Sequence, residues 1–296
     1  MQLILILRMR LRIRHILLLF AFSAFCILIL SFRDKQIKTI FNNRELIDKI
    51  FTAVDNVKTM RYKLQCNERI KGRMQYFESK VKLQVSPRKL YLSLKGPEVL
   101  WIQGANNGDA LVNPAAFPYM NLNLDPYGSL MRKDQHHTIH EMGFQYLADI
   151  LRDGLKKAGD KLDKYFTVVG EDNFYGKPCY KLSIVFPEFA WYSYTVKKGE
   201  NLVTIARKLK VSEYMVLMNN PKISWYNDVK EGQVIKVPNA YGKQTLLLID
   251  KETYLPVCNT VFDDQGLYEK YEYMDLQVNT VIAPEEFTKN YKGYHF

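Results

Sequence analysis

The densest group of residues able to do chemistry is the run Gln135-His136-His137-Thr138-Ile139-His140-Glu141. In a helix, His136 and His140 would lie one turn apart on one face, where two imidazoles can share a zinc ion. The run falls at the expected start of a helix, however, and the spacing fixes no Cys or acidic residue as a further ligand. A structural hydrogen bond is a sufficient role for His137. We therefore expect no metal ion and no cofactor.

Acidic residues offer no stronger catalytic centre. Asp109 with Asp125, and Glu171 with Asp172, are pairs by sequence only, and Asp125-Pro126-Tyr127-Gly128 is typical of a turn. The chain has no Gly-x-Ser-x-Gly elbow, P-loop, Rossmann fingerprint or His-Glu-x-x-His motif. We predict that the protein is not an enzyme.

Residues 194–238 predict a compact binding module made of two strands and two helices. The β-branched and aromatic run 194–196 predicts the first strand, and Gly199 ends it. Ser212 is a suitable N-cap for the second helix, and Pro221 stops that helix. The apolar positions are Leu202, Ile205, Ala206 and Leu209 in the first helix, Met215, Val216 and Met218 in the second helix, and Val234, Ile235 and Val237 in the last strand. In the first helix, Arg207, Lys208 and Lys210 are expected to face solvent.

This order, with the turn Gly199-Glu200-Asn201-Leu202 and the ending Gly-Gln-x-Ile-x-Val-Pro at 232–238, resembles the LysM module. LysM modules bind N-acetylglucosamine polymers, mainly peptidoglycan or chitin, so the resemblance implies glycan binding. It places the sugar groove between two loops, with Gly199, Glu200, Asn201 and Leu202 on one side and Asn219, Asn220, Pro221, Lys222 and Ile223 on the other.

The module departs from the LysM pattern at three places. Glu200 stands where Asp is usual, Asn201 stands where Thr is usual, and Ser224-Trp225-Tyr226 is inserted near the second loop. Trp225 or Tyr226 could stack on a sugar ring or could cap the module against the rest of the protein. The sequence leaves both open.

The rest of the chain, residues 44–191 and 242–296, is called the body below. An amphipathic helix from Asn43 has Leu46, Ile47, Ile50, Phe51 and Val54 on one face, and a second helix is expected from about Ile139 to Ala158. Alternation of apolar and polar residues predicts strands at 62–66, 81–85, 90–94, 99–102, 166–170, 179–186, 245–250, 256–262 and 267–278. This is an α+β class, a curved antiparallel sheet, or half-barrel, packed on helices.

The body resembles the LolA-like half-barrel of outer-membrane lipoprotein carriers, and more nearly a family of uncharacterised bacterial envelope domains thought to share that fold. The matching segments are Glu68-Arg69-Ile70-Lys71-Gly72, Lys95-Gly96-Pro97, Leu124-Asp125-Pro126-Tyr127-Gly128 and Gly176-Lys177-Pro178-Cys179-Tyr180. Residues 192–241 would be a LysM module inserted between the two parts of this domain, 44–191 and 242–296, since the strand order is complete without them.

The net charge of +11 does not indicate nucleic-acid binding. Residues 1–44 carry eight Lys and Arg against Asp34, a net +7, and residues 192–241 carry eight against four acidic residues, a net +4. The remainder of the body is neutral, so it has no basic groove for a phosphate backbone.

The N-terminal segment, residues 1–35, has the pattern of an export signal. Arg8, Arg10, Arg12 and Arg14 precede an apolar run at 16–32, which is just long enough to span a bilayer if it is not cleaved. We expect export to the periplasm or cell envelope. The segment can be either a cleaved signal peptide or an uncleaved inner-membrane anchor, and the sequence does not decide between them. The exported part holds Cys66, Cys179 and Cys258, which we expect to be small buried side chains.

Three functions compete. The first is a non-catalytic envelope protein that binds peptidoglycan through the LysM module, with the body as carrier or docking domain. The second is a periplasmic lipid or lipoprotein carrier that uses the concave face of the sheet. The third, an envelope hydrolase, needs a catalytic group that the sequence does not provide.

Overall fold

The computed structural model describes residues 42–117 and 119–296. The chain forms two compact units, Met1–Leu46 and Ile47–Phe296, and everything below lies in the second. Residues 1–35, predicted as a signal or anchor, and the apolar run at 16–32 lie outside the described residues.

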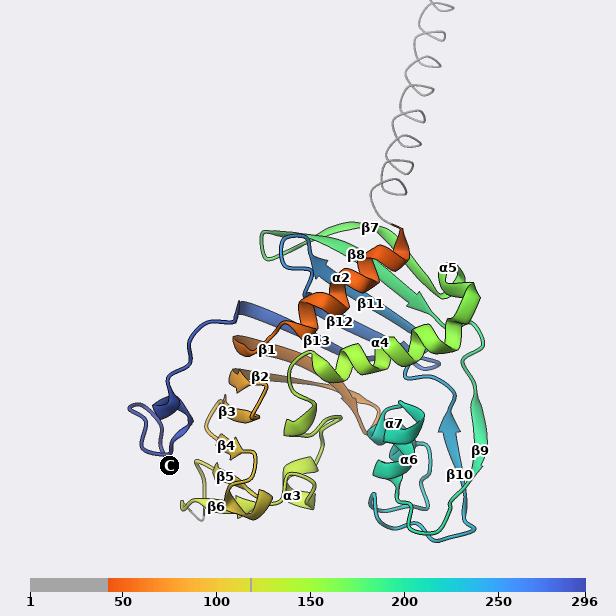
Figure 1. Ribbon diagram of the computed structural model, residues 1–296. Helices are drawn as coiled ribbons and strands as arrows, with labels where there is room; N and C mark the ends of the chain where they lie inside the picture. The colour runs from red at the N-terminus through yellow and green to blue at the C-terminus, as the bar shows by residue number, and fades with distance from the viewer. Residues whose placement is uncertain (1–41, 118) are drawn as a thin grey trace, which may run out of the picture. The chain divides into compact units, whose positions relative to one another are not determined.

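Most of the body is one sheet of eleven antiparallel strands in the order β6-β5-β4-β3-β2-β1-β13-β12-β11-β8-β7 (Figure 1). The edge strands β6 and β7 do not pair, so the sheet is curved but open over the part of the chain that is described. Its strands are β1 (Thr59–Ile70), β2 (Arg73–Gln84), β3 (Lys89–Leu94), β4 (Glu98–Ile102), β5 (Ala110–Asn113), β6 (Leu122–Leu124), β7 (Phe166–Phe174), β8 (Lys177–Val185), β11 (Gln244–Asp250), β12 (Pro256–Asp263) and β13 (Gly266–Val278).

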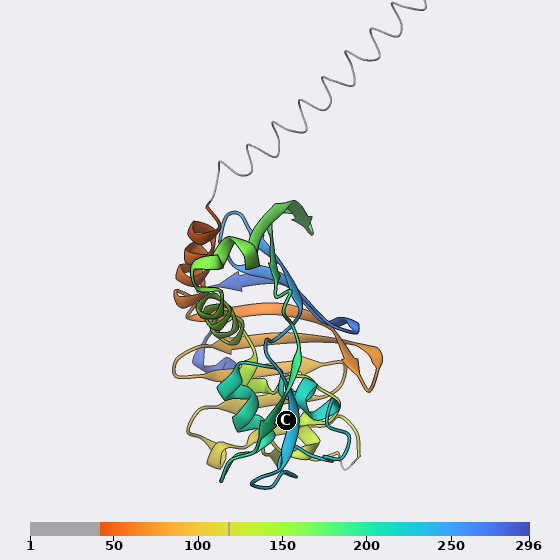
Figure 2. The ribbon, with the colours of Figure 1, turned by 90° about the vertical axis from the view of Figure 1, so that its right-hand side faces the viewer.

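Helices cover one face of this sheet, as Figure 2 shows. The helix α2 (Asn43–Asp55) enters the second unit at Ile47 and buries Ile47, Ile50 and Val54. The longer helix α4 (Gln145–Ala158) buries Leu147, Ala148 and Leu151. Two single-turn helices complete this set, α3 (Ser129–Arg132) and α5 (Leu162–Tyr165). The predicted α+β class and the curved antiparallel sheet are confirmed.

The predicted start of the second helix is wrong. The segment Ile139–Glu141 is a separate 3-10 turn, in which Thr138 and Glu141 form a capping box, and α4 begins only at Gln145. Gly143 separates the two with φ +91°, and a Cβ at this position would lie 2.8 Å from Leu83 Cδ2. A left-handed glycine in so tight a place cannot continue a helix.

Between β8 and β11 the chain forms a second, two-stranded sheet from β9 (Trp191–Thr195) and β10 (Val234–Pro238). The helices α6 (Leu202–Leu209) and α7 (Glu213–Met218) lie between these strands in sequence, so the predicted order strand, helix, helix, strand is confirmed. Ser212 accepts a hydrogen bond from Met215 N as the predicted N-cap of α7. Met218, however, is exposed, and Leu217 takes the buried position instead, in a core with Leu202, Ile205, Ala206, Val216, Ile235 and Val237.

The three cysteines of the described residues are buried and free. Burial is the main cause that raises the pKa of Cys66 to about 12 and the pKa of Cys179 and Cys258 to about 11. Since the thiolate is the reactive form, we expect iodoacetamide at pH 8 to label none of the three until the protein is denatured, as followed by peptide mass mapping. Labelling of any one in the folded protein at the rate of a free thiol would contradict this burial.

Candidate functional site

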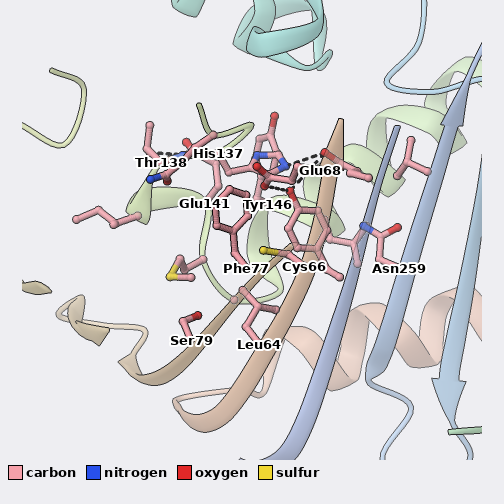
Figure 3. A pocket seen from close by; sticks show the side chains of 18 of the residues that line it. Leu64, Cys66, Glu68, Phe77, Ser79, His137, Thr138, Glu141, Tyr146 and Asn259 are labelled. Atoms are coloured by element: carbon pink, nitrogen blue, oxygen red, sulfur yellow. Dashed lines mark hydrogen bonds and ion pairs between the residues drawn. The ribbon is translucent and has the colours of Figure 1, made fainter. Parts of the chain in front are cut away.

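A cavity of about 460 Å³ lies between the helix-covered face of the sheet and α4. Its walls are mainly apolar and come from β1 to β5, from β11 to β13 and from α4, and Figure 3 shows Leu64, Cys66 and Phe77 on the strand side. The alternation of β1 explains the lining, because Tyr62, Leu64, Cys66 and Glu68 all point to the same face.

Polar groups gather at one end of this cavity, around Glu269 on β13. This carboxylate, whose residue is 1 % exposed, accepts a hydrogen bond from Tyr241 Oη at 2.8 Å. Its other oxygen lies 2.8 Å from His136 Nδ1 and 3.4 Å from His137 Nε2. Strand register brings Glu68 of β1 directly beside Glu269, and Glu68 accepts hydrogen bonds from Tyr271 Oη at 2.5 Å and from His136 N at 3.0 Å.

The charges of His137 and Glu269 stabilise each other. Burial opposes the protonated form of His137, but the charge of Glu269 and its hydrogen bond outweigh burial and raise the pKa of His137 to about 9. Burial likewise opposes the ionised form of Glu269, yet His137 and His136 hold its pKa well below the usual range. At neutral pH the pair is an imidazolium and a carboxylate.

The LysM module packs against the rim of the cavity through charged side chains. Arg207 of α6 contacts Glu141 Oε1 at 2.7 Å and Glu213 Oε1 at 2.8 Å. Glu213, at the start of α7, also forms a buried ion pair with Arg132 of α3. Arg207 had been expected to face solvent, and this expectation is wrong, since it joins the module to the body.

Aromatic residues complete the contact. Tyr214 stacks on the His136 ring with centroids 4.8 Å apart, and its hydroxyl accepts a hydrogen bond from Lys71 N at 3.1 Å. Tyr226 is 2 % exposed, and the Arg132 guanidinium lies 3.5 Å from the centre of its ring. Tyr226 therefore caps the module against the body. Trp225 meets Tyr226 edge to face and is partly buried, and its part in sugar stacking stays a prediction.

The residues predicted to hold a glycan occupy two loops that flank the helices of the module. Gly199–Leu202 leads into α6 and Asn219–Ile223 follows α7, whereas Arg207 and Glu213 stand at the other ends of these helices. The side chains of Leu202 and Ile223 lie in the module core, and Gly199, Pro221 and Lys222 are exposed.

The polar residues of these loops have local hydrogen bonds. Glu200 accepts from Tyr194 Oη and Lys197 N, and Asn201 caps α6 through Thr204 N. Asn219 Nδ2 donates to Met215 O, while Asn220 bonds the backbone of β10 at Lys236. The loops are thus fixed in shape, and their contacts with a sugar stay a prediction.

The structure separates His136 and His140. His136 faces Glu269, whereas the His140 ring lies between Trp101 and Tyr127, with centroids 4.8 Å and 4.9 Å away. Among the described residues, no group of three or more His, Cys, Asp or Glu side chains is placed to hold a metal ion. Of the acidic pairs, Asp172 contacts Lys181 and Glu171 contacts Lys251, and Asp125 accepts from Tyr127 N in the expected turn.

Sequence reasoning missed Glu269, Arg132 and Glu213. Glu269 lies in the alternating strand 267–278, and its position there, inward with Tyr271 and Tyr273, was the available signal. Arg132 and Glu213 are 81 residues apart, and nothing in the sequence connects them.

No helix within residues 42–117 and 119–296 combines the length and hydropathy needed to cross a bilayer.

Comparison with protein families identifies two parts of the chain. Residues 57–202 match the family described as "Protein of unknown function (DUF1571)", and residues 194–238 match the LysM domain. The chain therefore contains a DUF1571 domain and a LysM domain, and the LysM prediction is confirmed. No curated protein matches the sequence.

The chain is also similar to several solved structures, among them two mycobacterial proteins and a LolA superfamily protein. The lipoprotein LppX of Mycobacterium tuberculosis is 9% identical, with 80% of this chain and 96% of that chain covered and a TM-score of 0.38. LprF of Mycobacterium bovis is 11% identical, with 82% and 96% covered and a TM-score of 0.37. A LolA superfamily protein of Nitrosomonas europaea is 9% identical, with 85% and 99% covered and a TM-score of 0.32.

Proposed function

We propose that the protein is a non-catalytic component of the cell envelope that binds peptidoglycan through its LysM domain. The observation that carries this proposal is the LysM domain at residues 194–238. The geometry supports it, because the module is anchored to the body at Arg207 and Glu213, and the loops 199–202 and 219–223 lie at the opposite ends of its helices. Export through the apolar segment at 16–32 belongs to the same proposal.

We infer further that residues 192–241 are an inserted domain. In support, β8 and β11, which precede and follow the module, are paired neighbours from Val185–Gln244 to Cys179–Asp250. The backbone bond from Phe186 N to Lys243 O, 2.9 Å, extends this pairing to the base of the module. The body sheet is thus continuous across the point where the module leaves and returns.

The test is co-sedimentation of the full-length protein, kept in mild detergent, with isolated peptidoglycan. We expect binding that soluble N-acetylglucosamine oligomers compete away. The double substitution Asn219→Ala/Lys222→Ala should weaken binding by about tenfold, equivalent to about 1.4 kcal/mol. Lys230→Ala, an exposed lysine of the same module outside the two loops, is the matched control. Failure of the native protein to sediment with peptidoglycan would sink the proposal.

A second candidate function, a lipid carrier, is favoured by one observation, the cavity of about 460 Å³ beneath α4. This volume is within the range of small-molecule sites, which are mostly apolar with a few placed polar groups. The cavity meets that description, with polar groups at the Glu269 end and aliphatic and aromatic side chains elsewhere. The LysM domain would then hold the carrier at the cell wall.

A further inference from the structure

We infer that the cavity of the body takes an amphiphile whose polar end is uncharged and carries hydroxyl groups, such as a monoacylglycerol, and that it discriminates against anionic lipids. This inference rests on the second candidate function above, which supplies the cavity as a binding site. It adds the chemical class of the ligand, which follows from the charges of the wall and from one unpaired amide oxygen.

The charge of the wall disfavours an anionic head group. Among the described residues that line the cavity, three are acidic, namely Glu68, Glu141 and Glu269, and one is basic, His137. None of these lining residues is a Lys or an Arg. A phosphate or carboxylate placed here would be desolvated beside three carboxylates, with no arginine fork or ammonium to receive it.

The single basic group is already occupied. His137 Nε2 lies 3.1 Å from Tyr241 Oη and 3.4 Å from the Glu269 carboxylate, so its positive charge is balanced inside the protein. A second anion would have to displace Glu269, which also has Tyr241 and His136 as partners. That exchange would leave several buried groups unpaired.

The carboxylates of the wall are also occupied, which argues against a cationic head group as the preferred ligand. Glu141 is paired with Arg207 of the LysM module and accepts from Thr138 N at 2.7 Å. Glu68 accepts from Tyr271 and from the backbone of His136. A ligand ammonium would therefore compete with existing hydrogen bonds at each of these groups.

One polar atom in the residues of the wall, in contrast, has no hydrogen-bond partner. It is Asn259 Oδ1 on β12, which has less than 1 Å² of exposed surface, in a residue that is 9% exposed. Register places Asn259 beside Tyr271, which lies beside Cys66, so Asn259 belongs to the strand row next to the Glu68–Glu269 row. Figure 3 shows Asn259 at the strand side of the cavity, across from Tyr146.

The chemistry of this atom selects the ligand. An amide oxygen accepts hydrogen bonds. Asn259 lines the cavity, and once its amide turns toward the cavity a neutral hydroxyl can donate to Oδ1, whereas an ionised carboxylate or a phosphodiester has no proton to give. The acyl chain then fills the aliphatic part of the cavity, between β1–β3 and α4.

The experiment compares probes that share one C18 oleoyl or oleyl chain and differ in the polar end: monooleoylglycerol, oleate, oleylamine and oleoyl lysophosphatidate. Each is titrated against the full-length protein at pH 7.5, with displacement of a fluorescent acyl probe as the readout. We expect monooleoylglycerol to bind at least tenfold more tightly than oleate or the lysophosphatidate. Asn259→Leu should weaken monooleoylglycerol by about tenfold and leave oleate unchanged. Asn67→Leu, on the opposite face of β1, is the matched control.

The outcomes distinguish a failure of the carrier function from a failure of the inference about the head group. If none of the probes binds, the carrier function itself fails, and the head-group inference falls with it. If oleate, the lysophosphatidate or oleylamine binds as tightly as monooleoylglycerol, the cavity is a lipid site but the inference on its polar end is overturned. Circular dichroism and urea denaturation show whether the body of the Asn259→Leu protein is folded. A folded variant with unchanged affinity for monooleoylglycerol also overturns the role of Asn259.

Discussion

Arg132→Ala is expected to lower the free energy of unfolding by about 3 kcal/mol, the usual effect of breaking a buried ion pair by removing one partner. Arg132 is 3% exposed and Glu213 is 6% exposed, so neither is well solvated. The substitution leaves Glu213 with Arg207 alone and removes the guanidinium that lies over the Tyr226 ring. Urea denaturation followed by circular dichroism measures the change.

The controls distinguish a buried pair from a surface one. Arg152→Ala breaks the contact with Asp55, in which both side chains are well exposed, and should cost at most about 0.5 kcal/mol. The double substitution Arg132→Met/Glu213→Leu removes both charges and should recover most of the loss, because no buried charge is left without a partner and Arg207 keeps Glu141. An Arg132→Ala protein as stable as Arg152→Ala would contradict the burial of this contact. Limited proteolysis of the connections at 186–191 and 239–243 would show whether the module separates from the body before the sheet unfolds.

Glu269→Gln is expected to give the second large effect, and one that depends on pH. The pKa of His137 is raised from its ordinary value of 6.5 to about 9 in the folded protein. Stability from this group is therefore complete below pH 6.5 and is lost as the pH rises through 9. The lowered pKa of Glu269 gives the opposite slope in acid, where stability is lost as the pH falls below its ordinary value of 4.5.

The substitution should remove both slopes. At pH 6 the variant is expected to be less stable than the native protein by about 2 kcal/mol, below the cost for a fully buried charge, since it leaves the His137 imidazolium, whose side chain is 20% exposed, without its counter-charge. The difference should shrink steadily between pH 6.5 and pH 9, as the native protein itself loses the His137 proton. Urea denaturation at a series of pH values measures this, with Glu252→Gln, an exposed carboxylate, as control. A difference that stays constant from pH 6.5 to pH 9 would show that His137 does not titrate with Glu269.

The strands and the LysM module could be predicted from the sequence because both depend on local patterns. Alternation along β1 and β2 reports which face is buried, and the spacing of Leu202, Ile205 and Ala206 reports the inner face of a short helix. The short strands β5 and β6 were not predicted. Each has only three or four residues, too few for a period-two pattern to stand out. They form because β4 offers an edge to β5, and β5 in turn offers one to β6.

The candidate site was harder to predict, because its contacts are distant in sequence and involve charged residues. His136 and Glu269 are 133 residues apart, and although the alternation of β13 places Glu269 on the face of Tyr271 and Tyr273, it does not show which partner the carboxylate meets there. The same holds for Arg207, which is read as solvated on its own helix, because only the folded body brings Glu141 to it. The break at Gly143 was equally hidden, since a helical pattern continues on both sides of it.

The position of the module between β8 and β11 has a mechanical consequence. A pull on the LysM loops reaches the body through two connections that leave from the same end of neighbouring strands, joined at Phe186 N and Lys243 O. Because both connections run to the same module, a pull on it draws β8 and β11 in the same direction and does not peel one strand from the other. The Arg207–Glu141 and Glu213–Arg132 contacts act in parallel with these connections and share the load. If the LysM domain holds the protein at the cell wall, as proposed, these non-covalent contacts between module and body would break before the two chain connections do.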